Sequence, residues 1–340
     1  MLLVVFGAGA SYDSVPHRPA DPPQRQPYRP PLANQLFDDR PLFVDAMRRF
    51  PQCQPVIPDL RNVSATAGVE QVLSRFESEA EGYPERHKQL AAIKYYLHYA
   101  LWECQQYWRS EHNGITCYKT LLDQIEKWRY RAKERVCLVT FNYDTMLEEA
   151  LREFFHLKLG HLDHYLFEHD GYTIIKLHGS LNWGRELDTT FVPGTVPTTD
   201  LIIESAAQLQ ISTRYRIVNS HPMLVQDGHV LFPALAIPVE NKDSFECPDY
   251  HVKALRDSLS DVNKILTIGW RAKEADFLEM LQTLGPRPRR LMIISGSQTY
   301  AKETYQNLAG QGMGFSMPIL GEGGFSQLIR SRQVETFLQG

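Results

Sequence analysis

Two polar side chains, Asn142 and Asp144, follow the apolar run Val136 to Thr140, and a helical pattern follows them. This order is typical of a buried parallel strand that ends at a tight turn before a helix. His178-Gly179 follows a second apolar run, Tyr172 to Leu177, in the same way. An amide, a carboxylate and an imidazole can together hold a sugar hydroxyl or a water molecule and remove its proton. Because ligands of open α/β sheets bind at the carboxyl ends of strands, we expect these groups to share one site.

A glycine-rich turn follows a third apolar run. Met1 to Phe6 ends at Gly7-Ala8-Gly9-Ala10-Ser11. Glycines let the main chain approach a phosphate, and the start of the following helix favours its charge. The third glycine of the G-x-G-x-x-G pattern is missing, and Ser11 stands two residues after Gly9. We therefore expect Gly7, Ala8, Gly9 and Ser11 to bind a diphosphate.

Each of these motifs also has a purely structural interpretation. Glycine turns after strands are common, and Asn and Asp are favoured residues at helix starts. A lone histidine such as His178 is usually a hydrogen-bonded core residue. The functional interpretation rests on the three motifs occurring together at predicted strand ends of one sheet.

The rest of the chain predicts the sheet that must position these motifs. Strands alternate with helices in the second half, which is typical of parallel βαβ units; the expected strands are Val230 to Pro238, Val262 to Ile268, Leu291 to Ile294 and Phe315 to Leu320. The fold class is therefore α/β, a Rossmann-like doubly wound parallel sheet with a helical insertion. We assign 1–66, 136–185 and 228–340 to the Rossmann-like domain, 67–135 to the helical insertion and 186–227 to an irregular insertion.

Several segments have no assigned chemistry. The aromatic stripe of the 67–135 insertion could stack a ligand, although such stripes more often form a core or an oligomer interface. The segment Tyr12 to Pro31 is rich in proline and arginine and is too long for a simple connection. Four histidines between His156 and His169 lack paired cysteines or carboxylates in register, so surface histidines are a better explanation than a metal site.

Composition excludes several classes of protein. The 340 residues have a net charge of -4, which gives no electrostatic signature for direct nucleic-acid binding. The five cysteines form no C-x-x-C pair, so neither a zinc ribbon nor a secreted disulfide framework is expected. No apolar run reaches the roughly 20 residues that span a bilayer, and the apolar start lacks a basic leader. We expect a cytoplasmic protein.

These motifs, in this order, resemble those of the sirtuin family. G-A-G-x-S is similar to the first phosphate loop of the family, T-F-N-Y-D to its T-Q-N-x-D turn, and L-H-G to its catalytic His-Gly. Ile268 to Asp276 resembles the second nucleotide-binding turn, Ile293 to Ser297 the strand end near adenine, and Leu231 to Lys242 a segment of bacterial sirtuin-like proteins. The resemblance implies NAD as the substrate. It implies catalytic roles for Asn142, His178 and Asp144, with cofactor contacts from Gly7, Ala8, Gly9, Ser11, Phe141, Gly179, Gly269, Asp276 and Ser295.

The departures from the sirtuin pattern point to one branch of the family. The four-cysteine zinc module of the protein deacylases is absent, and Phe141 replaces the usual Gln. The pattern is more similar to the sirtuin-like NAD hydrolases of bacterial antiphage defence. That resemblance implies NAD hydrolysis without a metal. It also implies a homo-oligomer or a sensor partner, with short Argonaute proteins and DNA-translocase-like ATPases as candidates.

The chemistry expected of these residues is cleavage of the bond between nicotinamide and ribose. The sugar becomes oxocarbenium-like, and nicotinamide leaves as a neutral molecule, so no general acid is required. Asn142 would position the ribose or water, His178 would act as base and Asp144 would orient the site and favour the cationic sugar. Two alternatives stay open: an NAD-dependent protein deacylase or ADP-ribosyltransferase, and a non-catalytic module that senses NAD or ADP-ribose.

Overall fold

The computed structural model describes most of the chain. The described residues are 1–14, 28–62, 69–112, 115–156, 159–166, 171–189, 197–218, 225–226, 228–237 and 245–339. Most of the proline- and arginine-rich segment, and the second half of the 231–242 segment, lie outside these ranges.

A six-stranded parallel sheet forms the centre of the molecule. Its order is β10-β9-β8-β1-β2-β3, with β1 (Leu2–Phe6), β2 (Val136–Thr140), β3 (Tyr172–Lys176), β8 (Lys264–Ile268), β9 (Arg289–Ile294) and β10 (Phe315–Gly321). Counted along the chain, this is the 3-2-1-4-5-6 order of a Rossmann sheet. The strand order reverses between β1 and β8: β2 and β3 follow on one side of β1, and β8, β9 and β10 follow on the other. The predicted fold class, α/β and Rossmann-like, is confirmed by this order.

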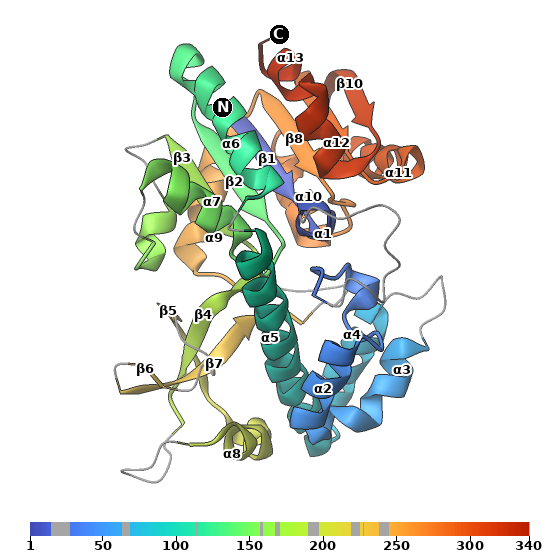
Figure 1. The fold of residues 1–340 in the computed structure, drawn as a ribbon, viewed down its shortest axis with the longest axis vertical. Coiled ribbons are helices and arrows are strands. Elements are labelled where there is room, and N and C mark those ends of the chain that lie inside the picture. The colour runs from blue at the N-terminus through green and yellow to red at the C-terminus, as the bar shows by residue number, and fades with distance from the viewer. Residues whose placement is uncertain are drawn as a thin grey trace.

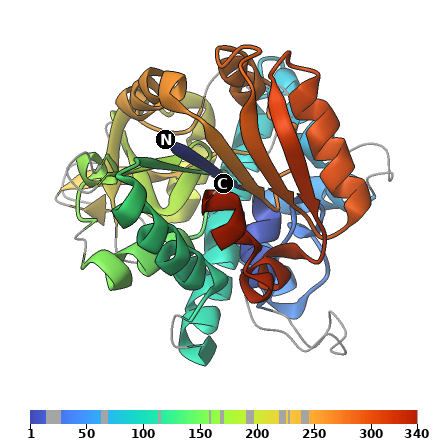
Figure 2. The same cartoon turned by 90° about the horizontal axis from the view of Figure 1, so that it is seen from above.

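The strands are central because both of their faces are covered. Every residue of β1 and β2 is buried, as the continuous apolar runs predict. Helices lie against both faces of the sheet (Figure 2). No helix within the described ranges is long and apolar enough to cross a membrane. The helices packed around this sheet are α1 (Ala8–Ser14), α6 (Cys117–Ala132), α7 (Met146–Phe155), α9 (Asp249–Ser258), α10 (Ala275–Gln282), α11 (Gln298–Ala309), α12 (Gly324–Ser331) and α13 (Gln333–Gln339).

A second, antiparallel sheet was not predicted. It has the order β5-β4-β7-β6, with β4 (Gly179–Leu187), β5 (Ile211–Ile217), β6 (Val225–Gln226) and β7 (His229–Leu235). The expectation that 186–227 is irregular was therefore wrong for β5 and β6, which lie inside it. So was the inclusion of the 230–238 strand among the parallel units, because β7 pairs antiparallel with β4. The half-exposed strand β5 has the mixed polar and apolar pattern of a sheet with one solvated face.

The remaining helices form a separate hydrophobic core with this second sheet: the longest of them, α5, packs on the sheet, and the others pack around α5 (Figure 1). They are α2 (Pro41–Arg49), α3 (Ile57–Arg61), α4 (Val69–Ala80), α5 (Pro84–His112) and α8 (Thr199–Glu204). By contrast, Tyr118, Leu121 and Ile125 of α6 belong to the core of the parallel sheet. The division into a Rossmann-like domain and insertions at 67–135 and 186–227 stays a prediction, and the packing groups these segments differently.

A buried histidine on α9 makes the stability of this fold depend on pH. His251 is fully buried, and its Nε2 donates a hydrogen bond to the Leu162 carbonyl at 3.1 Å. Burial lowers the pKa of His251 to about 4, from an ordinary value near 6.5. The unfolded chain therefore takes up the proton first, so stability is complete above pH 6.5 and is lost as the pH falls toward 4.

We expect His251 to reduce the free energy of unfolding by roughly 2 to 3 kcal/mol between pH 7.5 and 4.5. Urea unfolding at a series of pH values measures this slope in the wild type and in His251→Gln. The glutamine variant should lose this part of the slope while the carboxylates titrate as before. Identical slopes in the two proteins would contradict the assignment.

Candidate active site at the carboxyl edge of the parallel sheet

A cavity of about 2080 Å³ opens at the carboxyl ends of the parallel strands. It lies where the strand order reverses, which is where dinucleotides bind in Rossmann sheets. Its lining includes every site residue predicted from the sequence except Gly179, namely Gly7, Ala8, Gly9, Ser11, Phe141, Asn142, Asp144, His178, Gly269, Asp276 and Ser295. The fold thus brings the three motifs, from β1, β2 and β3, to one space.

The glycine turns after β1 and β8 contact each other main chain to main chain. Gly9 N donates to the Gly269 carbonyl at 3.1 Å, and Gly7 N donates to the Ile268 carbonyl at 3.0 Å. Gly269 has a φ of +61°, and a Cβ there would lie 2.3 Å from Ala10 N. A Cβ on Gly7 would lie 2.5 Å from the Gly269 carbonyl oxygen. Only glycine permits this approach, which leaves a cavity wall of bare main chain suited to a diphosphate.

A hydrogen-bond cluster joins the turn after β2 to Ser11 on α1. Ser11 Oγ donates to Asp144 Oδ2 at 2.6 Å, and Asn142 Nδ2 donates to Ser11 Oγ at 2.9 Å. Asn142 Nδ2 also donates to the Tyr118 hydroxyl at 3.1 Å, and that hydroxyl lies 3.0 Å from Ser11 Oγ. Asp144 Oδ1 accepts from Met146 N at 3.0 Å, so the same carboxylate satisfies the first turn of α7. Capping and site construction therefore coexist at Asp144.

The direction of these hydrogen bonds fixes the orientation of the Asn142 amide. The single Ser11 hydroxyl proton points to the Asp144 carboxylate, so Ser11 Oγ accepts from both Asn142 and Tyr118. Burial raises the pKa of Tyr118 well above its ordinary value, with the Asp144 charge adding to the effect, so its hydroxyl stays a donor. The Asn142 NH₂ group is thereby committed. Its Oδ1 accepts no hydrogen bond from any described residue, which makes it available to a ribose hydroxyl or a water molecule.

His178 lies on the same side of the cavity, between aromatic rings. Its ring meets Phe141 edge to face at 4.9 Å, and the Phe141 ring stacks on Trp270 at 5.8 Å and 9°. The Phe141 side chain therefore lines the cavity and contacts both the His178 imidazole and Trp270 in the turn after β8. His178 is partly exposed and lines the cavity. A group held in this way can reach a hydroxyl on a bound ligand.

Gly179 does not line the cavity. Its φ is +78°, and a Cβ there would lie 1.9 Å from the Ala234 carbonyl oxygen. The glycine lets β4 leave the parallel sheet and pair with β7 directly after His178. Its contribution to cofactor binding stays a prediction, and its position supports a role in placing His178 instead.

Sequence reasoning missed two residues of the site region. Tyr118 lies in the predicted helical insertion, where no role was expected for it, and its hydroxyl forms hydrogen bonds with Ser11 and Asn142. Lys176 ends β3 with no exposed surface, and its Nζ donates to the Asp144 carbonyl. The available signal was a lysine inside an otherwise apolar strand, since lysine is almost never fully buried without a partner.

No group of three or more His, Cys, Asp or Glu side chains among the described residues could hold a metal ion. His161 and His164 lie near each other, with ring centroids 5.3 Å apart, and both are exposed. His169 lies outside the described residues.

Comparison with known proteins finds similar structures but no matching family. No protein-family model and no curated protein matches the chain. A Sir2 homologue in complex with NAD aligns over 99% of this chain and 90% of its own, at 14% identity and a TM-score of 0.40. A second structure, described as showing the mechanism and regulation of Sir2 enzymes, has 12% identity, 99% and 92% coverage and a TM-score of 0.41. A mutant Sir2 homologue with ADP-ribose has 14% identity, 98% and 93% coverage and a TM-score of 0.40. The fold assignment here rests on the strand order of the sheet.

Proposed function

We propose that this protein is an NAD⁺ glycohydrolase, which cleaves NAD to nicotinamide and ADP-ribose. The observation that carries the proposal is the cavity at the strand-order reversal. It gathers the glycine turn after β1, the Asn142 and Asp144 turn after β2 and His178 after β3. The sequence motifs that resemble those of sirtuins lie on these same turns. The solved structures similar to this chain include Sir2 homologues bound to NAD and to ADP-ribose.

Each element of the cavity has a task in this reaction. The Gly7-to-Gly9 turn and Gly269 would let the diphosphate approach the main chain closely, and the start of α1 would favour its charge. Asp276 and Ser295 lie after β8 and β9, on the side expected for the adenosine. Asn142 Oδ1 would hold the ribose or the attacking water, and His178 would accept the proton from a ribose hydroxyl or that water. Asp144 would add negative charge near the developing oxocarbenium ion.

The experiment is incubation of the purified protein with NAD, followed by chromatography of nicotinamide and ADP-ribose. We expect equal amounts of the two products, and we expect Asn142→Ala to reduce their rate of formation by about 10²-fold or more, since one oriented polar group is worth that much in a transition state. Asn307→Ala is the matched control and should keep most of the rate, because Asn307 also lines the cavity but its amide donates to the Arg271 carbonyl, away from Asn142 and His178 in sequence. Wild-type turnover in Asn142→Ala would contradict the site.

The same assay separates the alternatives. Nicotinamide release that depends on an added acyl-peptide would identify a deacylase, and ADP-ribose found on protein would identify a transferase. Stoichiometric binding of NAD or ADP-ribose without product would identify a sensing module.

We further propose that the hydrolase is an effector of bacterial antiphage defence, restrained until a partner protein or self-assembly releases it. The support is the motif resemblance together with the need to restrain an enzyme that consumes NAD. Helix α5 is the candidate for transmitting the signal, because Gln105 Oε1 accepts from Thr145 N at 2.8 Å and Arg109 pairs with Glu149 at 3.3 Å. Turnover and oligomeric state are therefore measured with and without neighbouring gene products. Full activity of the isolated monomer would contradict the restraint.

A further inference from the structure

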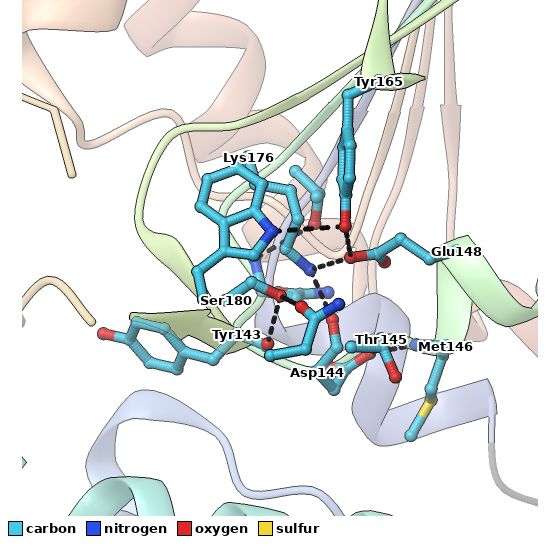
Figure 3. A network of polar contacts seen from close by, with 12 residues as sticks. Tyr143, Asp144, Thr145, Met146, Glu148, Tyr165, Lys176 and Ser180 are labelled. Carbon is cyan, nitrogen blue, oxygen red and sulfur yellow. Dashed lines mark hydrogen bonds and ion pairs between the residues drawn. The ribbon is translucent and has the colours of Figure 1, made fainter. Parts of the chain in front are cut away.

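A fully buried ion pair between Lys176 and Glu148 lies next to the turn after β2, at Tyr143 and Asp144 (Figure 3). Lys176, the last residue of β3, is 0% exposed and Glu148 on α7 is 1% exposed, with Nζ and Oε1 2.9 Å apart. Lys176 Nζ also donates to the main-chain carbonyl of Asp144. Removing two charged groups from solvent costs free energy, so a buried pair of this kind needs a structural or functional reason.

Stability alone is a weak reason for this pair. Glu148 Oε1 accepts a 3.4 Å hydrogen bond from the Tyr165 hydroxyl, which in turn accepts from Trp183 Nε1 at 3.2 Å. Glu148 Oε2, however, is buried without a hydrogen-bond partner among the described residues. An unsatisfied carboxylate oxygen destabilises the folded state, and apolar residues often replace buried pairs without loss of stability.

The turn is held by residues that precede and follow His178 in the sequence: Lys176 before it, and the start of β4 after it. The Tyr143 carbonyl accepts from Leu181 N at 2.8 Å, and it lies 3.3 Å from Ser180 Oγ, which donates to Asn182 Oδ1 at 2.6 Å. The next carbonyl, that of Asp144, accepts from Lys176. Residues on both sides of His178 therefore hold two successive carbonyls of the turn (Figure 3). This arrangement holds the turn to the main chain on either side of His178 in the sequence.

We propose that Lys176 is a positioning residue that sets the Asn142 and Asp144 turn in register with His178, and that Glu148 holds its ammonium in place. The proposal rests on the hydrolase function proposed above and adds a residue that does not touch the substrate. The carboxylate has a second effect. It neutralises an ammonium that would otherwise lie, uncompensated, beside the site where positive charge develops on the sugar.

The test uses the double variant Lys176→Met/Glu148→Gln. Removing lysine alone would leave a buried unpaired carboxylate and could unfold the protein. The double variant is uncharged and close in shape, and the glutamine carbonyl can still accept from Tyr165. We expect kcat for NAD to fall by about 10- to 100-fold, because small misplacements of reacting groups have effects of this size. KM, and the Kd for ADP-ribose by calorimetry, should change by less than about twofold, because the glycine turns are untouched.

Arg289→Met is the matched control. Arg289 is also a buried cation, 4% exposed, and its guanidinium donates to the Val262 and Leu284 carbonyls. It starts β9, at the amino ends of the parallel strands and therefore at the end of the sheet opposite the cavity. We expect this variant to lower the melting temperature while kcat stays within about twofold of the wild type.

Hydrogen–deuterium exchange separates failure of this proposal from failure of the proposed function. Exchange in the peptide 141–147 should increase in the double variant and stay unchanged in Arg289→Met. Unchanged exchange in 141–147, or faster exchange with an unchanged kcat, would overturn the positioning role. If the wild type releases no nicotinamide under any condition, the hydrolase function fails, and the exchange measurement still decides whether Lys176 holds the turn.

Discussion

His178→Ala is expected to reduce kcat for nicotinamide release by about 10²- to 10⁴-fold, the contribution of a positioned general base. The imidazole lines the cavity beside Phe141. The carbonyls of Tyr143 and Asp144 accept hydrogen bonds from Leu181 and Lys176, which follow and precede His178 in the sequence. KM should change little, because the substitution leaves unchanged the glycine turns after β1 and β8, which are the proposed diphosphate site. Steady-state kinetics and single-turnover rates with NAD measure both quantities.

Two controls distinguish loss of a base from loss of structure. His164→Ala removes an exposed histidine of the 3-10 turn Leu162–Tyr165, which does not line the cavity, and should leave turnover unchanged. Added imidazole should restore part of the turnover of His178→Ala, because the cavity is large enough to admit it. Wild-type turnover in His178→Ala would remove histidine from the mechanism. A rate loss together with a large fall in melting temperature and no response to imidazole would assign the residue to structure.

The parallel sheet and the meeting of the three motifs were predictable because continuous apolar runs identify strands covered on both faces. The runs at 1–6, 136–140 and 172–177 all became adjacent strands of one sheet. Once the strands are placed, the residues after them must meet at one edge. The polar partners of the site were not predictable in this way. Periodicity shows that Tyr118 faces inward but not that its hydroxyl lies beside Ser11.

The antiparallel sheet was missed for a different physical reason. Its strands are stabilised by pairing between segments distant in sequence, Gly179–Leu187 with His229–Leu235 and Ile211–Ile217. Local patterns carry little information about such pairing. Lys176 and Glu148 were missed because each partner alone looks like an exception to an apolar segment. Only the tertiary structure shows that they neutralise each other.

Gly269→Ala is expected to weaken ADP-ribose binding by about tenfold or more and to lower the free energy of unfolding by more than 1 to 2 kcal/mol. The residue has a φ of +61°, which disfavours any side chain, and its Cβ would lie 2.4 Å from the Gly9 carbonyl carbon. The turns after β1 and β8 would have to separate. That separation would break the hydrogen bond from Gly9 N to the Gly269 carbonyl and would deform the wall proposed for the diphosphate.

Gly296→Ala is the matched control for this prediction. Gly296 follows the next strand of the sheet, β9, and also lines the cavity, but a Cβ there would have no atom within 4 Å. Calorimetry with ADP-ribose and urea unfolding should therefore show near wild-type values for this variant. If Gly269→Ala and Gly296→Ala bind ADP-ribose equally well, the contact between the two glycine turns does not shape the ligand site. The diphosphate would then have to bind elsewhere in the cavity. The proposed contacts of Asn142 and His178 with the sugar would no longer follow, because they depend on the position of the diphosphate.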